Sequence, residues 1–315
     1  VNFLSGKNFK ITGVYNKEKS RLKNNKNVNY VKCNLLKLES VKKKIKNDKF
    51  DIIINSAAIL KSNSKDYRSI IKLYDYNVNI QKNLLATISK KKRSIFIFFS
   101  SISIYEDINK KTQINEFHNY NLNNMYALSK ICGENLLEAA TISSNIFGIS
   151  LRLSGVHGEG RNNGVIYNMF KNATNNEFVK INEPKSVFRL TFLDDINKAI
   201  YLIINKKLKT KYSFYNLASE DIYSLKKLAD NVIKICKKGK LKLLSNSKIR
   251  YQVLNINKFK KDYKYKSTPL LKKLKKYNEY YKSLKNLEVN KWIYFDKRFL
   301  KYLAVLPREL SLVIL

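Results

Sequence analysis

The chain has 315 residues, of which 44% are hydrophobic and 12% aromatic, which is enough for a sizeable core and excludes a disordered chain. Three prolines, nine glycines and the lack of any apolar run of about 18 residues exclude collagen-like sequence and transmembrane helices. The three cysteines are widely spaced and lack CxxC spacing. We therefore expect no disulfide framework and no metal site, as is usual for a protein of the reducing cytoplasm.

The formal net charge of +38 suggests nucleic acid as a partner. Arginine, which makes bidentate contacts with phosphates and bases, supplies only nine of the 62 basic residues, and the lysines are spread along the chain. Abundant Asn, Ile and Tyr are typical of an A/T-rich coding sequence. We expect no specific nucleic-acid partner; the alternative, a lysine-rich nucleic-acid binder, predicts an affinity that falls steeply with salt.

Short apolar runs alternate with longer helical ones in the first half of the chain. Apolar residues that recur about every three to four positions predict helices at 36–46, 67–90, 124–143 and 194–205. Runs rich in Ile, Val and Phe predict strands at 10–15, 29–33, 51–55, 94–100 and 147–153. Because strands that alternate with helices form parallel sheets covered on both faces, we expect an α/β fold with a doubly wound parallel sheet.

The regular alternation is lost after Leu153. Residues 155–185 are rich in Gly and Asn, and residues 238–282 are rich in lysine. Further elements are expected at 165–173, 214–217, 224–237, 249–254 and after Pro269. Residues 283–315 form an amphipathic tail whose final apolar run is too short to span a bilayer, so we expect it to dock on the protein's own body.

Tyr126 and Lys130 are the strongest chemical signal. Their spacing in the helix predicted at 124–143 puts both side chains on one face, one turn apart. An ammonium beside a phenol favours the phenolate, and lowering a tyrosine pKa from about 10 to about 7 requires roughly 4 kcal/mol. Such a tyrosine can exchange a proton with a substrate hydroxyl or carbonyl. With 21 tyrosines in the chain, the alternative is a chance pair on the surface.

Ser101 ends the most apolar predicted strand, 25 residues before Tyr126. Ligands of open parallel sheets bind beyond the carboxyl ends of the strands. A serine hydroxyl at that place can hydrogen-bond the substrate oxygen that Tyr126 protonates. The alternative is that Ser100, Ser101 and Ser103 merely end the strand.

Together these residues resemble the extended short-chain dehydrogenases/reductases of the NAD-dependent epimerase/dehydratase family, many of which modify nucleotide sugars. In that family a Ser/Thr four positions before a Tyr, here Ser101 and Tyr105, precedes the YxxxK pair. The resemblance implies a Rossmann-type fold and an NAD(P) cofactor. It implies that Tyr126 is the acid/base, helped by the positive nicotinamide ring, that Lys130 holds the nicotinamide ribose and that Ser101 polarises the substrate.

Further matches follow in the family's order, among them LR…HGEG at 151–160 and YNLAS at 215–219. The resemblance implies that the cofactor-binding residues are Asn16, Lys17, Asn34, Leu35, Asn55, Ala57, Ala58, Asn77, Ser100, Tyr126 and Lys130. It implies substrate contacts from Ser101, Ser103 and Arg189, the last of which would meet a diphosphate.

Two other features have structural explanations. His157 stands where the family places an aromatic residue, so we expect it to pack. Asp194 and Asp195 could form a paired-carboxylate site, but a helix N-cap with an acidic neighbour is the favoured interpretation.

The sequence departs from the family at its beginning. The family starts with a strand and a GxxGxxG turn whose amides hold the cofactor pyrophosphate, and no such turn is present. Either the sequence starts too late, or it is a truncated relative. Asn16-Lys17, with Arg21 nearby, replaces the acidic residue that binds an NAD ribose, which favours NADP. Ser101-Ile102-Ser103 lacks the acidic pair of dehydratases, which disfavours elimination of water.

We therefore expect oxidoreduction at a sugar carbon of a nucleotide sugar, by an epimerase or a 4-keto reductase. The alternative is a catalytically inactive truncated relative that binds or regulates. Expected domains are a Rossmann-type domain (1–154 plus 186–218), a small discontinuous substrate lobe (155–185 plus 219–282) and the tail (283–315). The resemblance also suggests a cytoplasmic homodimer formed through the helices at 67–90 and 124–143.

Overall fold

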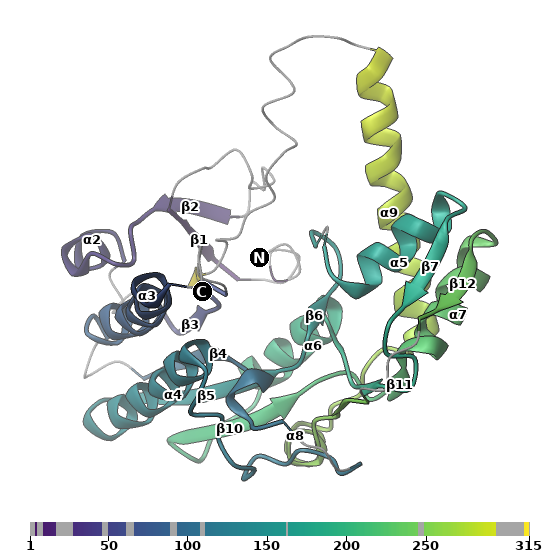
Figure 1. Ribbon diagram of the computed structural model, residues 1–315. Coiled ribbons are helices and arrows are strands. Elements are labelled where there is room, and N and C mark those ends of the chain that lie inside the picture. The colour runs from purple at the N-terminus through teal and green to yellow at the C-terminus, as the bar shows by residue number, and fades with distance from the viewer. Residues whose placement is uncertain are drawn as a thin grey trace.

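A seven-stranded sheet with helices on both faces forms the centre of the computed structural model (Figure 1). The structure describes residues 4, 9–16, 28–45, 50–60, 66–88, 93–107, 111–161, 163–244, 249–293 and 312–314, without the side chains of 285–293 and 312–314. In spatial order the strands are β10 (Tyr212–Leu217), β5 (Ile146–Leu153), β4 (Ser94–Ser101), β3 (Ile52–Asn55), β14 (Leu312–Ile314), β1 (Ile11–Tyr15) and β2 (Val28–Lys32). Except at β14, every neighbouring pair is parallel.

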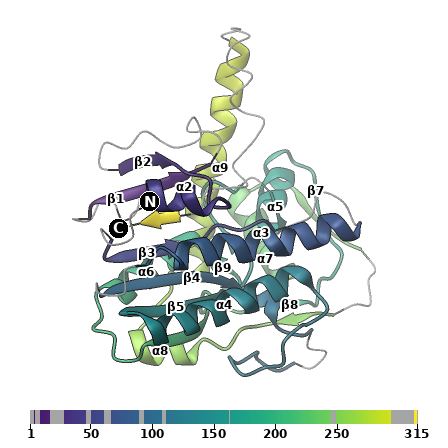
Figure 2. The same ribbon diagram turned by 90° about the vertical axis from the view of Figure 1, so that its left-hand side faces the viewer.

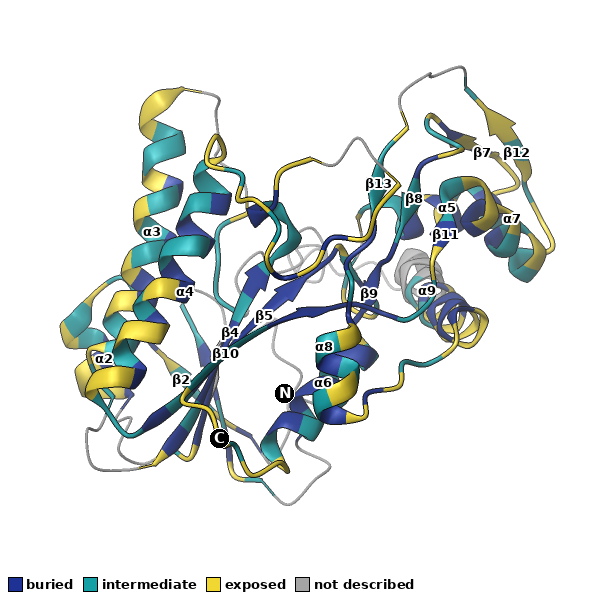
Figure 3. Cartoon of the chain, turned by 90° about the horizontal axis from the view of Figure 1, so that it is seen from below, coloured by how far each residue is buried: buried dark blue, intermediate teal, exposed yellow. Residues whose placement is uncertain are grey.

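Two layers of helices cover this sheet (Figures 2 and 3). One face carries α2 (Leu38–Lys44), α3 (Tyr67–Leu85) and α4 (Met125–Ser143), and the other carries α6 (Leu193–Ile204) and α8 (Asn257–Tyr263). Phe96 and Phe98 pack toward α3 and α4, while Ile97 between them packs with the α6 and α8 side chains. The central strands are buried on both faces, as their unbroken apolar runs predicted. The predicted doubly wound α/β fold is confirmed.

β14 lies inside the sheet, between β1 and β3. Its three residues run antiparallel to both neighbours, and Leu312 pairs with Val14 on one side and Asn55 on the other. Within the described residues, no parallel strand lies between β1 and β3. The predicted docking of the tail on the protein's own body is confirmed for 312–314.

A second group of elements packs around its own apolar cluster beside the sheet (Figure 3). Its helices are α5 (Val165–Thr174), α7 (Leu225–Cys236) and α9 (Leu270–Ile293). Two of its sheets have two strands each: β7 (Phe178–Ile181) pairs with β12 (Lys240–Leu243), and β6 (Val156–His157) pairs with β9 (Thr191–Phe192). The third has three strands, with β8 (Val187–Phe188) between β11 (Tyr223–Ser224) and β13 (Tyr251–Gln252). α9 passes without a break through residue 282, and the predicted domain boundaries stay a prediction. None of the described helices is long and apolar enough to cross a membrane.

The start of α6 differs from its prediction. The N-cap residue is Phe192, and Asp194 and Asp195 both lie in the first helical turn, so the predicted N-cap role of the aspartates is wrong. Asp195 is fully buried and binds partners from other segments, because its carboxylate accepts from Thr268 N (2.9 Å) and pairs with Lys273 Nζ on α9 (3.0 Å). The side chain therefore ties α9 to α6.

Candidate functional site

Ser101, Tyr126 and Lys130 meet at the carboxyl edge of the sheet. Ser101 ends β4 and caps the short helix η3 (Ile102–Ile104), where its Oγ accepts from Ser103 N (3.1 Å). Tyr126 lies in the first turn of α4, whose N-cap Asn124 accepts from Tyr126 N (2.9 Å). The Ser101 hydroxyl donates to Ser103 Oγ (3.1 Å) and acts to lower the pKa of the Tyr126 phenol. A strand end and a helix start, each fixed by its own cap, thus bring the two hydroxyls together.

The phenol of Tyr126 is in its neutral form at neutral pH. Burial raises its pKa to about 12, although the Ser101 hydroxyl acts in the opposite direction. Lys130 Nζ lies 5.8 Å from the centre of the Tyr126 ring and donates to the carbonyl oxygen of Phe99 (2.8 Å) instead of the phenol. Lys130 alone therefore does not lower the tyrosine pKa, and a second cation near the phenol is needed to favour the phenolate.

Lys130 is almost completely buried, with 3% of the residue exposed. Its Nζ also lies 4.8 Å from the centre of the Phe98 ring. Burial lowers the pKa of its amine to about 7, and the charge of Glu134, one turn further along α4, acts in the opposite direction. Because this pKa lies near neutrality, a small change in the surroundings is enough to protonate or deprotonate the amine.

Arg152 and Glu134 form a buried ion pair that the sequence did not predict as part of the site. Arg152 Nη2 lies 2.7 Å from Glu134 Oε2, and the residues are 1% and 4% exposed. An arginine inside an apolar strand was the available signal, because a buried charge requires a partner. Only tertiary packing identifies that partner.

The predicted cofactor residues that follow β1 and β2 lie at the same edge of the sheet. Asn16 directly follows β1 and is half-buried. Asn34 turns the chain after β2, since its Oδ1 accepts from Leu36 N (3.0 Å), and Leu35 lies in this turn. Lys17 and Arg21, on which the preference for NADP rests, lie outside the described residues.

The loop after β3 is held by two buried asparagines. Asn55 Oδ1 accepts from Ala57 N (3.0 Å). The Asn77 side chain, from α3, accepts from Ile59 N (2.8 Å) and donates to Ile59 O (3.0 Å). These bonds fix a half-buried loop in which Ala57 and Ala58 carry only small side chains. The predicted roles of these residues in cofactor binding stay a prediction.

Two predicted site residues carry buried polar atoms that have no hydrogen-bond partner within the described structure. One is Ser100 Oγ, at the end of β4 beside Ser101. The other is Nε of Arg189, which lies between β8 and β9 and whose Nη1 donates to the carbonyl oxygen of Leu254. Burial lowers the pKa of the Arg189 guanidinium, so an anion beside it would be favourable. Arg189 lies between two strands of the second group of elements, and its backbone N–H donates to Gln252 O of β13 (3.2 Å).

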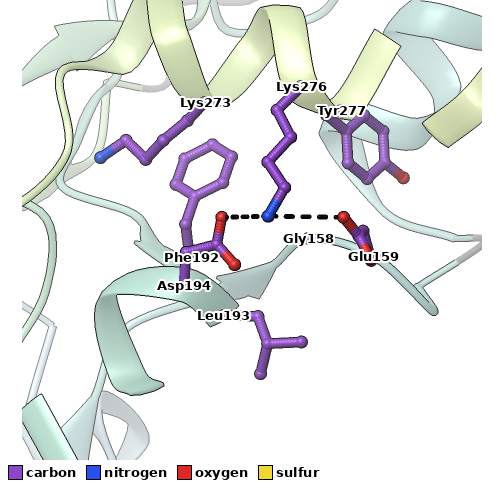
Figure 4. A pocket seen from close by; sticks show the side chains of 8 residues that line it. All are labelled: Gly158, Glu159, Phe192, Leu193, Asp194, Lys273, Lys276 and Tyr277. Carbon is purple, nitrogen blue, oxygen red and sulfur yellow. Dashed lines mark hydrogen bonds and ion pairs between the residues drawn. The ribbon is translucent and has the colours of Figure 1, made fainter. Parts of the chain in front are cut away.

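A small pocket lies between α9 and α6 (Figure 4). Lys276 Nζ lies between Asp194 Oδ2 (2.7 Å) and Glu159 Oε1 (3.5 Å). These charges pair with one another and connect α9 to α6. We therefore assign this pocket no chemistry. Neighbouring His157 is buried, and burial lowers the pKa of its imidazole to about 3, as suits a packing role.

Residues 1–218 match the model of the NAD dependent epimerase/dehydratase family. Among curated proteins no relative matches the chain. Similar solved structures include UDP-glucuronic acid 4-epimerase from Bacillus cereus with UDP-glucuronic acid and NAD (18% identity, 84% of each chain covered, TM-score 0.70). Another is UDP-glucose 4-epimerase from Thermotoga maritima with UDP-glucose (18% identity, 90% of this chain and 94% of that chain covered, TM-score 0.74). At these identities the structures show a shared Rossmann-type fold, and the family match over more than half of its residues shows that the chain belongs to the NAD dependent epimerase/dehydratase family.

Proposed function

We propose that the protein catalyses NAD(P)-dependent oxidoreduction at a sugar carbon of a nucleotide sugar, as an epimerase or a 4-keto reductase. The observation that carries this proposal is the placement of Ser101 at the end of β4 and of Tyr126 in the first turn of α4, with the Lys130 amine 5.8 Å from the centre of the tyrosine ring. Both hydroxyls can reach one substrate oxygen there. The family of the chain and the nucleotide-sugar epimerases among its structural neighbours support this chemistry.

In this reaction Tyr126 moves the proton. Its phenol gives a proton to a sugar carbonyl oxygen during reduction and takes one from the sugar hydroxyl during oxidation. Ser101 hydrogen-bonds the same oxygen and holds it in line with the phenol. Lys130, with a pKa of about 7, supplies a positive charge that can be present near neutral pH. A bound nicotinamide would supply the acceptor and donor of the hydride.

The nicotinamide end of the site suits such a cofactor. Ser100 Oγ is a buried hydroxyl without a partner in the described structure, so a ligand amide or ribose hydroxyl would satisfy it. Ala57 and Ala58 keep the neighbouring loop small. The GxxGxxG turn for the pyrophosphate is not found within the described residues. NAD is bound in the Bacillus cereus structure, and the preference of this chain for NADP stays a prediction.

Arg189 supports a substrate that carries a diphosphate. Its Nε is buried without a partner in the described structure, and burial lowers the pKa of its guanidinium. An anionic group would satisfy this nitrogen and favour its charge. The two similar epimerases have UDP-glucuronic acid and UDP-glucose bound. A homodimer through α3 and α4 stays a prediction.

The test combines cofactor binding with turnover. NADH and NADPH are titrated by fluorescence, and UDP-glucose and UDP-glucuronic acid are then incubated with each oxidised cofactor while products are followed by NMR. An epimerase forms the C4 epimer without net change of the cofactor, whereas a 4-keto reductase consumes one reduced cofactor for each 4-keto sugar supplied. Tyr126→Phe should lose turnover and keep cofactor binding.

The matched control is Tyr67→Phe, because Tyr67 is 76% exposed on α3 and should leave turnover unchanged. Cofactor binding without turnover of any nucleotide sugar, equal in wild type and Tyr126→Phe, would favour the non-catalytic alternative. Absence of cofactor binding would contradict the proposal altogether.

A further inference from the structure

Arg152 uses all five of its N–H groups inside the protein. Nε donates to Glu134 Oε1 (3.0 Å), and Nη2 donates to Glu134 Oε2 (2.7 Å) and to the hydroxyl of Tyr120 (2.8 Å). Nη1 donates to the hydroxyl of Tyr105 (2.9 Å) and to the carbonyl oxygen of Glu116 (2.7 Å). An arginine that is 1% exposed and fully bonded has one defined orientation.

The partners of Arg152 belong to two parts of the chain that hold the reacting residues. Tyr105, Glu116 and Tyr120 belong to the connecting segment that joins the Ser101 turn to the start of α4, here its described residues 105–107 and 111–124. Glu134 lies on α4 itself, two turns beyond Tyr126. Arg152 therefore binds the connecting segment and the tyrosine helix at the same time.

Tyr105 transmits this position to Ser101. It is the C-cap residue of η3, whose N-cap is Ser101, and its backbone N–H is bonded to Ile102 O (3.1 Å). One turn of 3₁₀ helix thus separates the serine from a side chain anchored on Arg152. A shift of the Tyr105 hydroxyl would move η3 and the serine with it.

A second strand supports the same arrangement. Asn216 on β10 is the direct neighbour of Arg152 on β5. Tyr105 donates to Asn216 Oδ1 (2.7 Å), and Asn216 N donates to Glu116 Oε1 (3.0 Å). Two buried polar side chains on adjacent strands hold the connecting segment against the sheet, and no sugar or cofactor is needed for these contacts.

We propose that Arg152 is a positioning residue that sets the place of the Ser101 hydroxyl relative to Tyr126, by binding the connecting segment through Tyr105 and α4 through Glu134. This inference rests on the proposed function for its effect on turnover. Glu134 has a further consequence, because its charge raises the pKa of Lys130. The same ion pair thereby also influences the amine of the site.

Tyr105→Phe is the decisive variant. Arg152→Met would leave Glu134 buried without its partner and can prevent folding. Tyr105→Phe removes one hydroxyl, keeps the ring and changes no charge. We expect kcat to fall roughly tenfold, within the ~10²-fold that a 1 Å misplacement costs, while KM and the cofactor Kd stay unchanged. Tyr212→Phe is the matched control, since its hydroxyl bonds Ser150 (3.0 Å) on the same two strands but does not bond Arg152.

Hydrogen exchange supplies a measurement that does not depend on activity. Peptides from residues 101–126 should exchange faster in Tyr105→Phe than in Tyr212→Phe, because only the first variant loses an anchor of the connecting segment. If wild type turns over no nucleotide sugar, the proposed function fails and the exchange comparison still tests the positioning. Equal exchange in the two variants, or unchanged kcat in Tyr105→Phe, would overturn the inference.

Discussion

Replacing Lys130 by Met is expected to stabilise the fold while it removes the amine from the site. Burial lowers the pKa of this amine to about 7, against 10.5 for an ordinary lysine. Below pH 7 the folded protein therefore buries a charged ammonium, which costs free energy. In the unfolded chain the same charge is in water, where this cost is absent. At 1.36 kcal/mol for each pKa unit, the unfavourable free energy amounts to about 5 kcal/mol.

Two favourable contacts of the amine are lost in the variant. The hydrogen bond to Phe99 O (2.8 Å) leaves that carbonyl without its donor, at about 1–3 kcal/mol, and the contact with the Phe98 ring contributes about 1 kcal/mol. Methionine fills similar volume and adapts to its surroundings. The net gain in the free energy of unfolding at pH 7 is therefore about 1–3 kcal/mol.

The pH dependence makes the test sharper. Between about pH 7 and pH 10.5 the unfolded chain binds a proton at Lys130 that the folded protein has lost, so wild type gains stability as the pH rises. The advantage of Lys130→Met should shrink by about 1 kcal/mol per pH unit. Ionisation of the tyrosines affects both proteins and cancels in the difference.

Urea unfolding followed by circular dichroism at pH 7, 8 and 9 measures this difference. Lys234→Met, at an exposed position on α7, is the control for removing a lysine. A Lys130→Met variant that is less stable than wild type at pH 7, or an advantage that is constant from pH 7 to pH 9, would show that the buried Lys130 amine does not destabilise the fold.

Urea unfolding at pH 7 also tests one prediction about packing and one about ion pairs. In Gly133→Ala the new Cβ would lie 2.5 Å from Cζ of Phe98. This overpacking should lower the free energy of unfolding by about 1–3 kcal/mol, although alanine is preferred in helices. An unchanged value would mean that α4 can move away from β4. Asp195→Asn leaves the fully buried amine of Lys273 without its closest carboxylate and should cost about 3–5 kcal/mol, whereas Lys276→Ala breaks ion pairs between half-exposed side chains and should cost less than about 1 kcal/mol. Equal costs for these two changes would contradict the role of burial.

The elements around the central sheet could be predicted because each has a local signature. The Ile and Phe run of β4 identifies a strand buried on both faces, and the periodic apolar residues of α3 and α4 identify helices. The pair formed by β7 and β12 could not be predicted in this way. Each strand has four residues, too few for a clear pattern, and their pairing joins parts of the chain that are far apart in sequence.

The reacting side chains were predictable for the same reason, and their surroundings were not. Helical spacing puts Tyr126 beside Lys130, and a strand end puts Ser101 at the carboxyl edge. That Lys130 donates to the Phe99 carbonyl, and that Arg152 binds Glu134, depends on which strand lies beneath α4. Charged residues in apolar segments indicate that a partner exists, but the tertiary fold selects it.

The direction of β14 decides whether a helix start, with its free N–H groups, can follow this strand at the carboxyl edge of the sheet. β14 pairs Leu312 with Val14 and Asn55, near the carboxyl ends of β1 and β3, so its chain enters the sheet at the edge where Ser101 and Tyr126 lie. A parallel strand in this place would leave the sheet there and could lead into a helix whose first N–H groups face an anion. Leu-Val-Ile suits a buried strand in either direction, because its apolar side chains carry no sense of direction. Apolar patterning therefore predicts that the tail docks. Only the hydrogen-bond register shows that β14 begins, and does not end, at the carboxyl edge of the sheet.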